Sequence, residues 1–339
     1  MATVAATHAV PRSAGPDAYE AVVGVGMLTM IAAAAVMAGW LPIGFSIAIV
    51  FLFAGPHNWF EARYFMARMP PRWGRLRPYF LTGIGGVLGL TASMIALPWL
   101  VRAAGGGMEA WHVAVATWNT AFVVWIGGLA SMRARQNPRR SWPWIWPTVL
   151  AATSLAWLAP VGWSLALVYL HPVVSLFFLD AEIARRRPDL RTAYRLCLLA
   201  VPAALAVLAW RLADAPDLTG DDVLTAQITA HAGAGIVPHV STHFLVAAHT
   251  FLEMLHYATW CVALPLLTGG MPWRLADVPL ARRSPGWRAM LVAVLATGAV
   301  VVMLFWTGFL LDYPLTRSVY FTVAILHVLA EVPFLLREL

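Results

Sequence analysis

The chain contains very few charged residues and no lysine. Only 12% of its 339 residues are charged, whereas a soluble domain contains about 25%. All 23 basic residues are arginines, which is typical of a GC-rich bacterial genome. Because 60% of the residues are hydrophobic and the mean hydropathy is +0.72, the composition excludes a soluble protein and predicts a polytopic membrane protein.

Cysteine is also scarce, and several common catalytic motifs are missing. Cys197 and Cys261 stand alone in apolar segments, so they make neither a disulfide framework nor a CxxC metal site. The sequence has no Walker loop, no GxSxG elbow and no CxxCH haem-attachment motif. Any metal is therefore expected to bind through nitrogen and oxygen atoms.

The apolar runs predict an all-α fold, a polytopic helical bundle embedded in a membrane. A span needs about 20 mostly apolar residues, which allows about ten spans here, or eight to nine if closely spaced neighbours merge. We predict a cytoplasmic tail over residues 1–20, one transmembrane domain over 21–337, and a solvated external loop over 213–239. The predicted helices cover residues 21–38, 41–69, 79–101, 111–132, 144–158, 161–183, 193–212, 240–267, 287–311 and 318–336.

The arginines predict how the chain is oriented. They gather in the segments that follow every second predicted helix, and only Arg102, Arg211 and Arg317 fall on the other side. By the positive-inside rule, this asymmetry places both termini in the cytoplasm, as expected for a protein of the bacterial inner membrane. Because the arginines lie in short loops between apolar segments, they do not predict nucleic-acid binding. The lipid bilayer is the expected partner.

The least expected residues in the apolar segments are histidines and glutamates. In three segments a histidine is followed four residues later by a glutamate, and His171 lies in a fourth segment. An acidic side chain at the centre of a membrane helix costs on the order of 2.5 kcal/mol or more. Such residues therefore indicate a functional site or a bridge between helices. The three pairs are His57/Glu61, His249/Glu253 and His327/Glu331.

These residues are expected to share helix faces and similar depths in the membrane. Residues i and i+4 lie on the same helix face, and in the predicted topology all four segments cross the membrane in the same direction. Glu253 and His256 add a Glu-x-x-His spacing, which in di-iron bundles brings both side chains of one helix to a shared metal centre. We therefore predict that the four helices converge on one metal site. Its predicted ligands are His57, Glu61, His171, His249, Glu253, His256, His327 and Glu331.

Three stretches around these histidines form a recognisable pattern. They are Gly55-Pro56-His57 near one helix end, His171-Pro172, and the stretch from His249 to Tyr257. In their histidine placement they resemble the Brp/Blh family of bacterial membrane carotene dioxygenases. That resemblance implies a polytopic protein whose histidines hold a non-haem iron, and which cleaves a carotene centrally to retinal. The chain departs from the family's Pro-His-Gly type of segment, because Asn58 follows His57.

Together these features predict an integral membrane metalloprotein, and more specifically an oxidoreductase acting on a lipophilic small molecule that enters from the bilayer. Imidazole and carboxylate ligands suit non-haem iron, with copper as an alternative. A b-type haem protein with axial histidines is a rival, although axial ligation does not need three glutamates. A proton-coupled transporter also uses such residues. A structural subunit with partners in a larger membrane complex is the last alternative.

Overall fold

The protein is built from helices. The computed structural model describes residues 16–70, 72–136, 142–267 and 274–338, and no strand occurs among them. Within these residues, nine helical segments are long and apolar enough to cross a membrane, and Ile145–Leu158 is a shorter apolar helix. The predicted all-α membrane bundle is confirmed, and the nine candidate spans among the described residues fall within the predicted range of eight to ten.

The helices follow the predicted segments closely, and two local breaks are explained by prolines. Pro202 has no N–H to donate to the carbonyl four residues earlier, and the path of one span is interrupted there, between α7 and α8. Pro265 likewise lacks a donor, and the preceding turn, Thr259–Ala263, widens to a π-helix. In chain order the helices are α1 (Pro16–Trp40), α2 (Pro42–Arg68), α3 (Arg77–Ala103), α4 (Met108–Gln136), α5 (Ile145–Leu158), α6 (Pro160–Arg186), α7 (Arg191–Leu198), α8 (Ala200–Leu212), α9 (Val223–His231), α10 (Thr242–Ala258), α11 (Leu264–Leu267), α12 (Pro285–Leu311) and α13 (Tyr313–Glu338).

Two parts of the predicted organisation, the N-terminal tail and the segment over 213–239, differ from the structure. The helix α1 begins at Pro16, earlier than the predicted start at residue 21, and residues 1–15 of the predicted tail lie outside the described residues. The predicted external segment over 213–239 contains α9 (Val223–His231), so part of it is helical rather than an irregular loop. Ile228 and Ala232 of this segment are only 2% and 1% exposed, because they pack against Leu245 and Val246 of α10.

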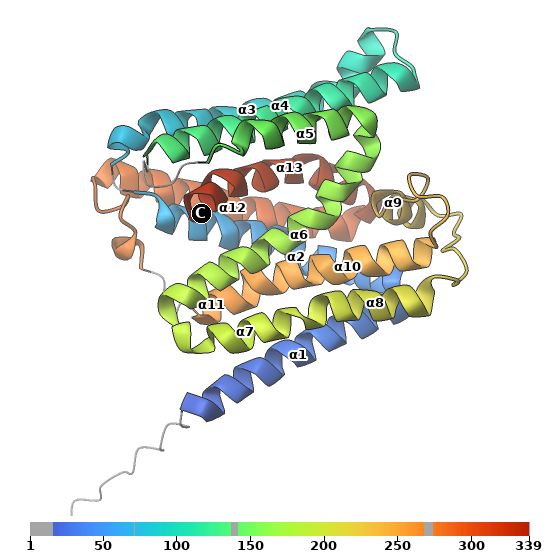
Figure 1. Cartoon of the computed structure of the whole chain (residues 1–339), viewed down its shortest axis with the longest axis horizontal. Coiled ribbons are helices and arrows are strands. Elements are labelled where there is room, and N and C mark those ends of the chain that lie inside the picture. The colour runs from blue at the N-terminus through green and yellow to red at the C-terminus, as the bar shows by residue number, and fades with distance from the viewer. Residues whose placement is uncertain (1–15, 71, 137–141, 268–273, 339) are drawn as a thin grey trace, which may run out of the picture.

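The helix α10 runs through the middle of the bundle. It packs against α1, α2, α6 and α8, and in Figure 1 it lies between α6 and α8. In the apolar part of the span that contains α10 (Thr242–Leu267), 61% of the residues are buried, compared with 6% in α12. Polar side chains on α10 therefore face the protein interior rather than lipid.

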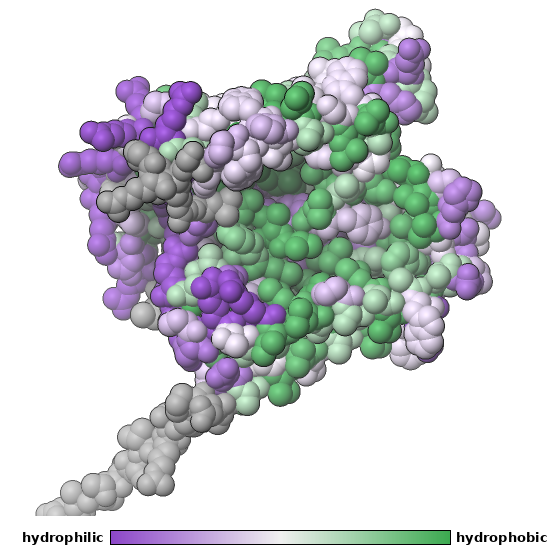
Figure 2. All heavy atoms as spheres, viewed as in Figure 1, coloured by the Kyte–Doolittle hydropathy of each residue, from purple (hydrophilic) through white to green (hydrophobic). Residues whose placement is uncertain are grey.

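The surface of the bundle suits a bilayer. Successive long helices run back and forth across the molecule, and α1 begins on the same side as the C-terminus (Figure 1). Figure 2 shows hydrophobic residues over the middle of this face and hydrophilic residues gathered toward its two ends. Trp210, Leu158 and Leu311 are 78%, 83% and 82% exposed. Such exposure of large apolar side chains is expected where lipid tails, not water, surround the helices.

Candidate metal centre

The helix α2 presents His57 and Glu61 to the interior, and each is only 1% exposed. The Nδ1 atom of His57 lies 2.9 Å from the carbonyl oxygen of Phe53. Since a carbonyl oxygen can only accept a hydrogen bond, Nδ1 carries the proton and donates. The Nε2 atom then keeps its lone pair, and it is buried without a hydrogen-bond partner. This is the arrangement in which a histidine binds a metal through Nε2 while a backbone carbonyl orients the ring.

His171 of α6 meets two side chains of α13. Its Nδ1 atom lies 3.3 Å from Oε2 of Glu331, and its Nε2 atom lies 3.2 Å from Nε2 of His327. The imidazole of His171 thus has a carboxylate on one edge and a second imidazole on the other. A carboxylate behind a histidine holds the ring in one orientation, as it does behind the ligands of many metal sites.

His256 of α10 completes a group of four imidazoles. Its ring centroid lies 5.2 Å from that of His57 and 4.7 Å from that of His171. The ring of His327 lies 5.1 Å from both His57 and His171. His256 is 2% exposed, and neither of its ring nitrogens has a hydrogen-bond partner. The four helices α2, α6, α10 and α13 therefore converge, as predicted.

Six of the predicted ligands form one group, which we call the histidine cluster. It consists of His57, Glu61, His171, His256, His327 and Glu331. One ligand atom from each of His57, Glu61, His256 and His327 lies within 4.8 Å of the others, and the same holds for His171, His256 and Glu331. Because His256 belongs to both sets, the two sets are continuous. Nitrogen and oxygen atoms gathered this closely can hold a metal ion in either set.

The remaining two predicted ligands lie elsewhere, which corrects the prediction of a single site. His249 precedes His256 by seven residues, or about 10 Å along the axis of α10. It lies instead beside Glu253 and beside His231 at the end of α9, and ligand atoms of these three residues are within 4.8 Å of one another. We call His231, His249 and Glu253 the α9 cluster.

Sequence alone does not identify His231 as a member of any site. It belongs to a segment that is rich in aspartate and glycine and therefore looks like a solvated loop. The one available signal is Asp222, a residue type favoured at the start of helices. Asp222 precedes the first residue of α9, and its side chain accepts a hydrogen bond of 2.8 Å from the backbone N–H of Thr225 in the first turn. Nothing in the sequence shows where that short helix packs.

The acidic side chains at the end of α6 hold helices together rather than joining the histidine cluster. Glu182 is fully buried and forms ion pairs with Arg68 of α2 and Arg186 of its own helix. Asp180 is bound by Arg191 and Arg195 of α7, each at 2.9 Å. These pairs join α2 and α7 to α6 at one end of the bundle.

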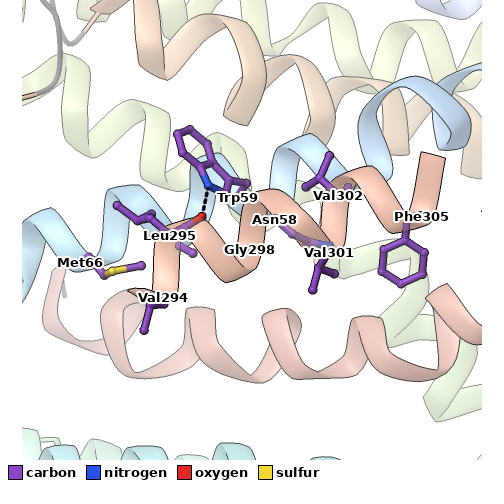
Figure 3. Close-up of a pocket in the computed structure, with 11 residues that line it drawn as sticks. Asn58, Trp59, Met66, Val294, Leu295, Gly298, Val301, Val302 and Phe305 are labelled. Carbon is purple, nitrogen blue, oxygen red and sulfur yellow. Dashed lines mark hydrogen bonds between the residues drawn. The ribbon is translucent and has the colours of Figure 1, made fainter. Parts of the chain in front are cut away.

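An apolar cavity of about 170 Å³ lies between α2 and α12. Figure 3 shows Asn58 and Trp59 on the α2 side of this cavity, where the indole N–H of Trp59 donates to the carbonyl oxygen of Leu295 at 3.0 Å. Val301 of α12 lines the cavity and is 42% exposed, so the cavity lies next to the lipid-facing surface. Asn58, which lines the cavity, directly follows His57 in α2, although the two side chains point to different faces of the helix.

No protein-family model, curated protein or solved structure matches this chain. The resemblance to the Brp/Blh carotene dioxygenases therefore stays a prediction based on the sequence pattern. Function is inferred from the histidine cluster and its surroundings.

Proposed function

We propose that the protein is an integral membrane oxidoreductase that binds a non-haem metal ion, iron in the first instance, at the histidine cluster. The observation that carries this proposal is a set of buried ligand atoms that lack hydrogen-bond partners. Each such atom costs about 1–3 kcal/mol, and a bound cation would satisfy several of them at once. The atoms are His57 Nε2, Glu61 Oε2, His256 Nδ1 and Nε2, His327 Nδ1 and Glu331 Oε1.

Charge also supports a divalent cation at this place. Glu61 lies close enough to Glu331 for the two carboxylates to interact electrostatically, and they are only 1% and 2% exposed. Buried charges in proteins are normally paired or coordinate a metal. Two carboxylates and four neutral imidazoles together neutralise one divalent ion, so the ion would remove the repulsion between the carboxylates.

The ligand types favour iron, with copper as the alternative metal. Imidazole and carboxylate together suit non-haem iron sites that keep an open coordination position. The bound metal would supply the redox chemistry. The residues of the cluster would hold the ion, Glu331 would orient His171, and the packed helices would exclude bulk water from the site.

The substrate is proposed to be a lipophilic small molecule that enters from the bilayer. The cavity between α2 and α12 has a mostly apolar lining and lies at a lipid-facing surface. It lies against α2, the helix that also carries His57 and Glu61. A carotene, which the resemblance to the Brp/Blh family implies, is one candidate within this class.

A b-type haem fits the cluster less well. Two axial histidines stand on opposite faces of a porphyrin, with the whole macrocycle between them. Here the ring of His256 is in contact with those of His57 and His171, at centroid distances of 5.2 and 4.7 Å. A porphyrin would need a wide, flat slot between one pair of histidines, whereas here two further imidazoles pack around each pair. A Soret band in the absorption spectrum of the purified protein would contradict this reasoning.

A proton-coupled carrier is the second candidate, because ionisable side chains continue along the bundle beyond the histidine cluster. The α9 cluster contributes Glu253 toward one end, and Glu182 lies buried toward the other. Chains of such residues relay protons in membrane pumps and transporters. Proton uptake coupled to a solute in liposomes of metal-free protein would favour the carrier. A purely structural subunit of a membrane complex would show neither metal binding nor transport.

The proposed location is the bacterial inner membrane, with both termini in the cytoplasm. The arginine distribution supports this orientation, as does the position of the start of α1 and the C-terminus on one side of the bundle (Figure 1). A reporter fused to the C-terminus should be active only when the reporter works in the cytoplasm. Activity of a periplasm-specific reporter at that position would reject the orientation.

The deciding experiment measures iron, copper, zinc and manganese per chain in protein purified from metal-replete cells. His57→Ala and His256→Ala should each lose the ion that the histidine cluster binds. His112→Ala is the control, because His112 belongs to neither cluster, and it should keep the wild-type metal content. Wild-type protein that contains no metal and binds none on reconstitution would rule out the metalloenzyme proposal.

A further inference from the structure

The α9 cluster is a built site and not a chance meeting of surface residues. His249 and Glu253 of α10 are 5% and 7% exposed, and Nδ1 of His249 lies 3.5 Å from Oε2 of Glu253. The ring of His231 lies across that of His249, with centroids 5.0 Å apart and planes at 82°. One nitrogen or oxygen atom from each of the three residues lies within 4.8 Å of the others.

Contacts outside the cluster fix the end of α9 against α10. The hydroxyl oxygen of Tyr169 in α6 lies 2.8 Å from the carbonyl oxygen of Ala232 and 2.9 Å from that of Leu245. Tyr169 also packs its ring against His249, at a centroid distance of 5.6 Å. Since Ala232 directly follows His231, these contacts hold the His231 side chain beside α10.

The half-buried ring of His231 leaves the α9 cluster open to a ligand at the edge of α9. The ring packs against those of His249 and Phe321, and within the described residues its nitrogens form no hydrogen bond. Beside it, the imidazole of His249 and the carboxylate of Glu253 are buried, and burying a polar group costs free energy unless the group is paired. Two imidazoles and one carboxylate are a complete donor set for a divalent transition metal, with further positions left for water.

We propose that His231, His249 and Glu253 form a second metal site, separate from the histidine cluster, which binds a divalent transition-metal ion such as Zn²⁺ or Fe²⁺. The site lies where α9, outside the membrane-spanning helices, packs onto α10. An ion therefore reaches it from the aqueous end of the bundle. His249 and His256 are two helical turns apart along α10, and their ligand atoms fall in different groups, so the site is distinct from the histidine cluster.

The two sites should differ in affinity because their charges differ. The guanidinium group of Arg317 lies 4.5 Å from the ring centroid of Phe321 and donates to the carbonyl oxygen of Gln227. It is close enough to interact electrostatically with Glu253, but the two form no ion pair within the described residues. Its positive charge opposes a cation in the α9 cluster. The histidine cluster has two carboxylates instead of one. The α9 cluster should therefore lose its ion first.

The test is metal titration of the full-length protein in detergent after the purified protein has been stripped with a chelator. Zn²⁺ is the probe. Elemental analysis gives the number of ions bound per chain, and calorimetry gives their affinities. We expect a tighter and a weaker class of sites in the wild type. His231→Ala and Glu253→Gln should remove the weaker class only, whereas His256→Ala should remove the tighter class only. His239→Ala is the matched control, since His239 is also a histidine of the 213–239 segment but lies outside the α9 cluster.

Folding of each variant is checked by helical circular dichroism and by gel filtration, so that a misfolded variant is not counted. If folded His231→Ala binds Zn²⁺ with the wild-type stoichiometry, the second site is refuted while the proposed function stands. If His256→Ala keeps every ion and His231→Ala loses one, the second site stands and the histidine cluster fails as a metal centre. Arg317→Gln is an independent test. It removes the positive charge near the α9 cluster and should therefore increase the affinity of the weaker class of sites for Zn²⁺. A weakening in folded Arg317→Gln would count against the proposal.

Discussion

Replacing Glu182 by glutamine tests whether the buried ion pairs at the end of α6 hold together the helices that carry the histidine cluster. The Glu182 side chain is 0% exposed, while those of Arg68 and Arg186 are 20% and 49% exposed. Removing one partner of a buried pair typically costs about 3–5 kcal/mol. Because Arg186 can turn toward water and Arg68 cannot do so fully, we expect the lower end, about 3 kcal/mol. In a large domain this corresponds to a fall in Tm of about 6 °C.

The assay is thermal unfolding in detergent, and the matched control is Asp180→Asn. Asp180 is on the same helix as Glu182 and is also paired with two arginines. Its partners, Arg191 and Arg195 of α7, are 41% and 56% exposed. Surface ion pairs contribute little, so the control should lower Tm much less. Since Glu182 joins α2 to α6, its loss should also weaken metal binding at His57 and His171. Equal Tm shifts for the two variants would refute the idea that the buried ion pairs of Glu182 hold α2 against α6.

Three further predictions concern the site, the cavity and α9. Glu331→Gln should lower metal affinity about 10–100-fold, because His171 is no longer held in one orientation. The affinity is measured by competition with a chelator. An unchanged affinity would exclude an orienting role for Glu331. Gly298→Leu should block the cavity, where even a Cβ would lie 3.1 Å from Trp59, and should abolish binding of the lipophilic substrate without changing metal content. The N–H of Thr225 holds the pKa of Asp222 below its usual value. The cap should therefore stabilise α9 at neutral pH and lose its effect as the pH falls below about 4. Hydrogen exchange in α9 should accelerate with acid in the wild type, and Asp222→Asn should remove that dependence.

The bounds of the helices, and which side chains share a face of one helix, could be predicted from the sequence. The apolar runs set the spans, because in a bilayer every backbone N–H and C=O must be bonded within the helix itself. Thus the span predicted over 41–69 is observed as Pro42–Arg68. The i, i+4 spacing put His57 and Glu61 on one face of α2, and both lie in the histidine cluster. These are local properties, which depend on residues a few positions apart.

Which helix each face meets was decided only by the tertiary structure. In the sequence Glu331 is four residues from His327, yet in the fold its carboxylate pairs with His171 of α6. His249 is on the same helix as His256, yet it belongs with His231, a residue of the short helix α9. Helical periodicity gives the rotation and depth of a side chain on its own helix. It does not give the neighbouring helix, which depends on how whole surfaces pack. The division of eight predicted ligands into two clusters is therefore a property of the packed bundle.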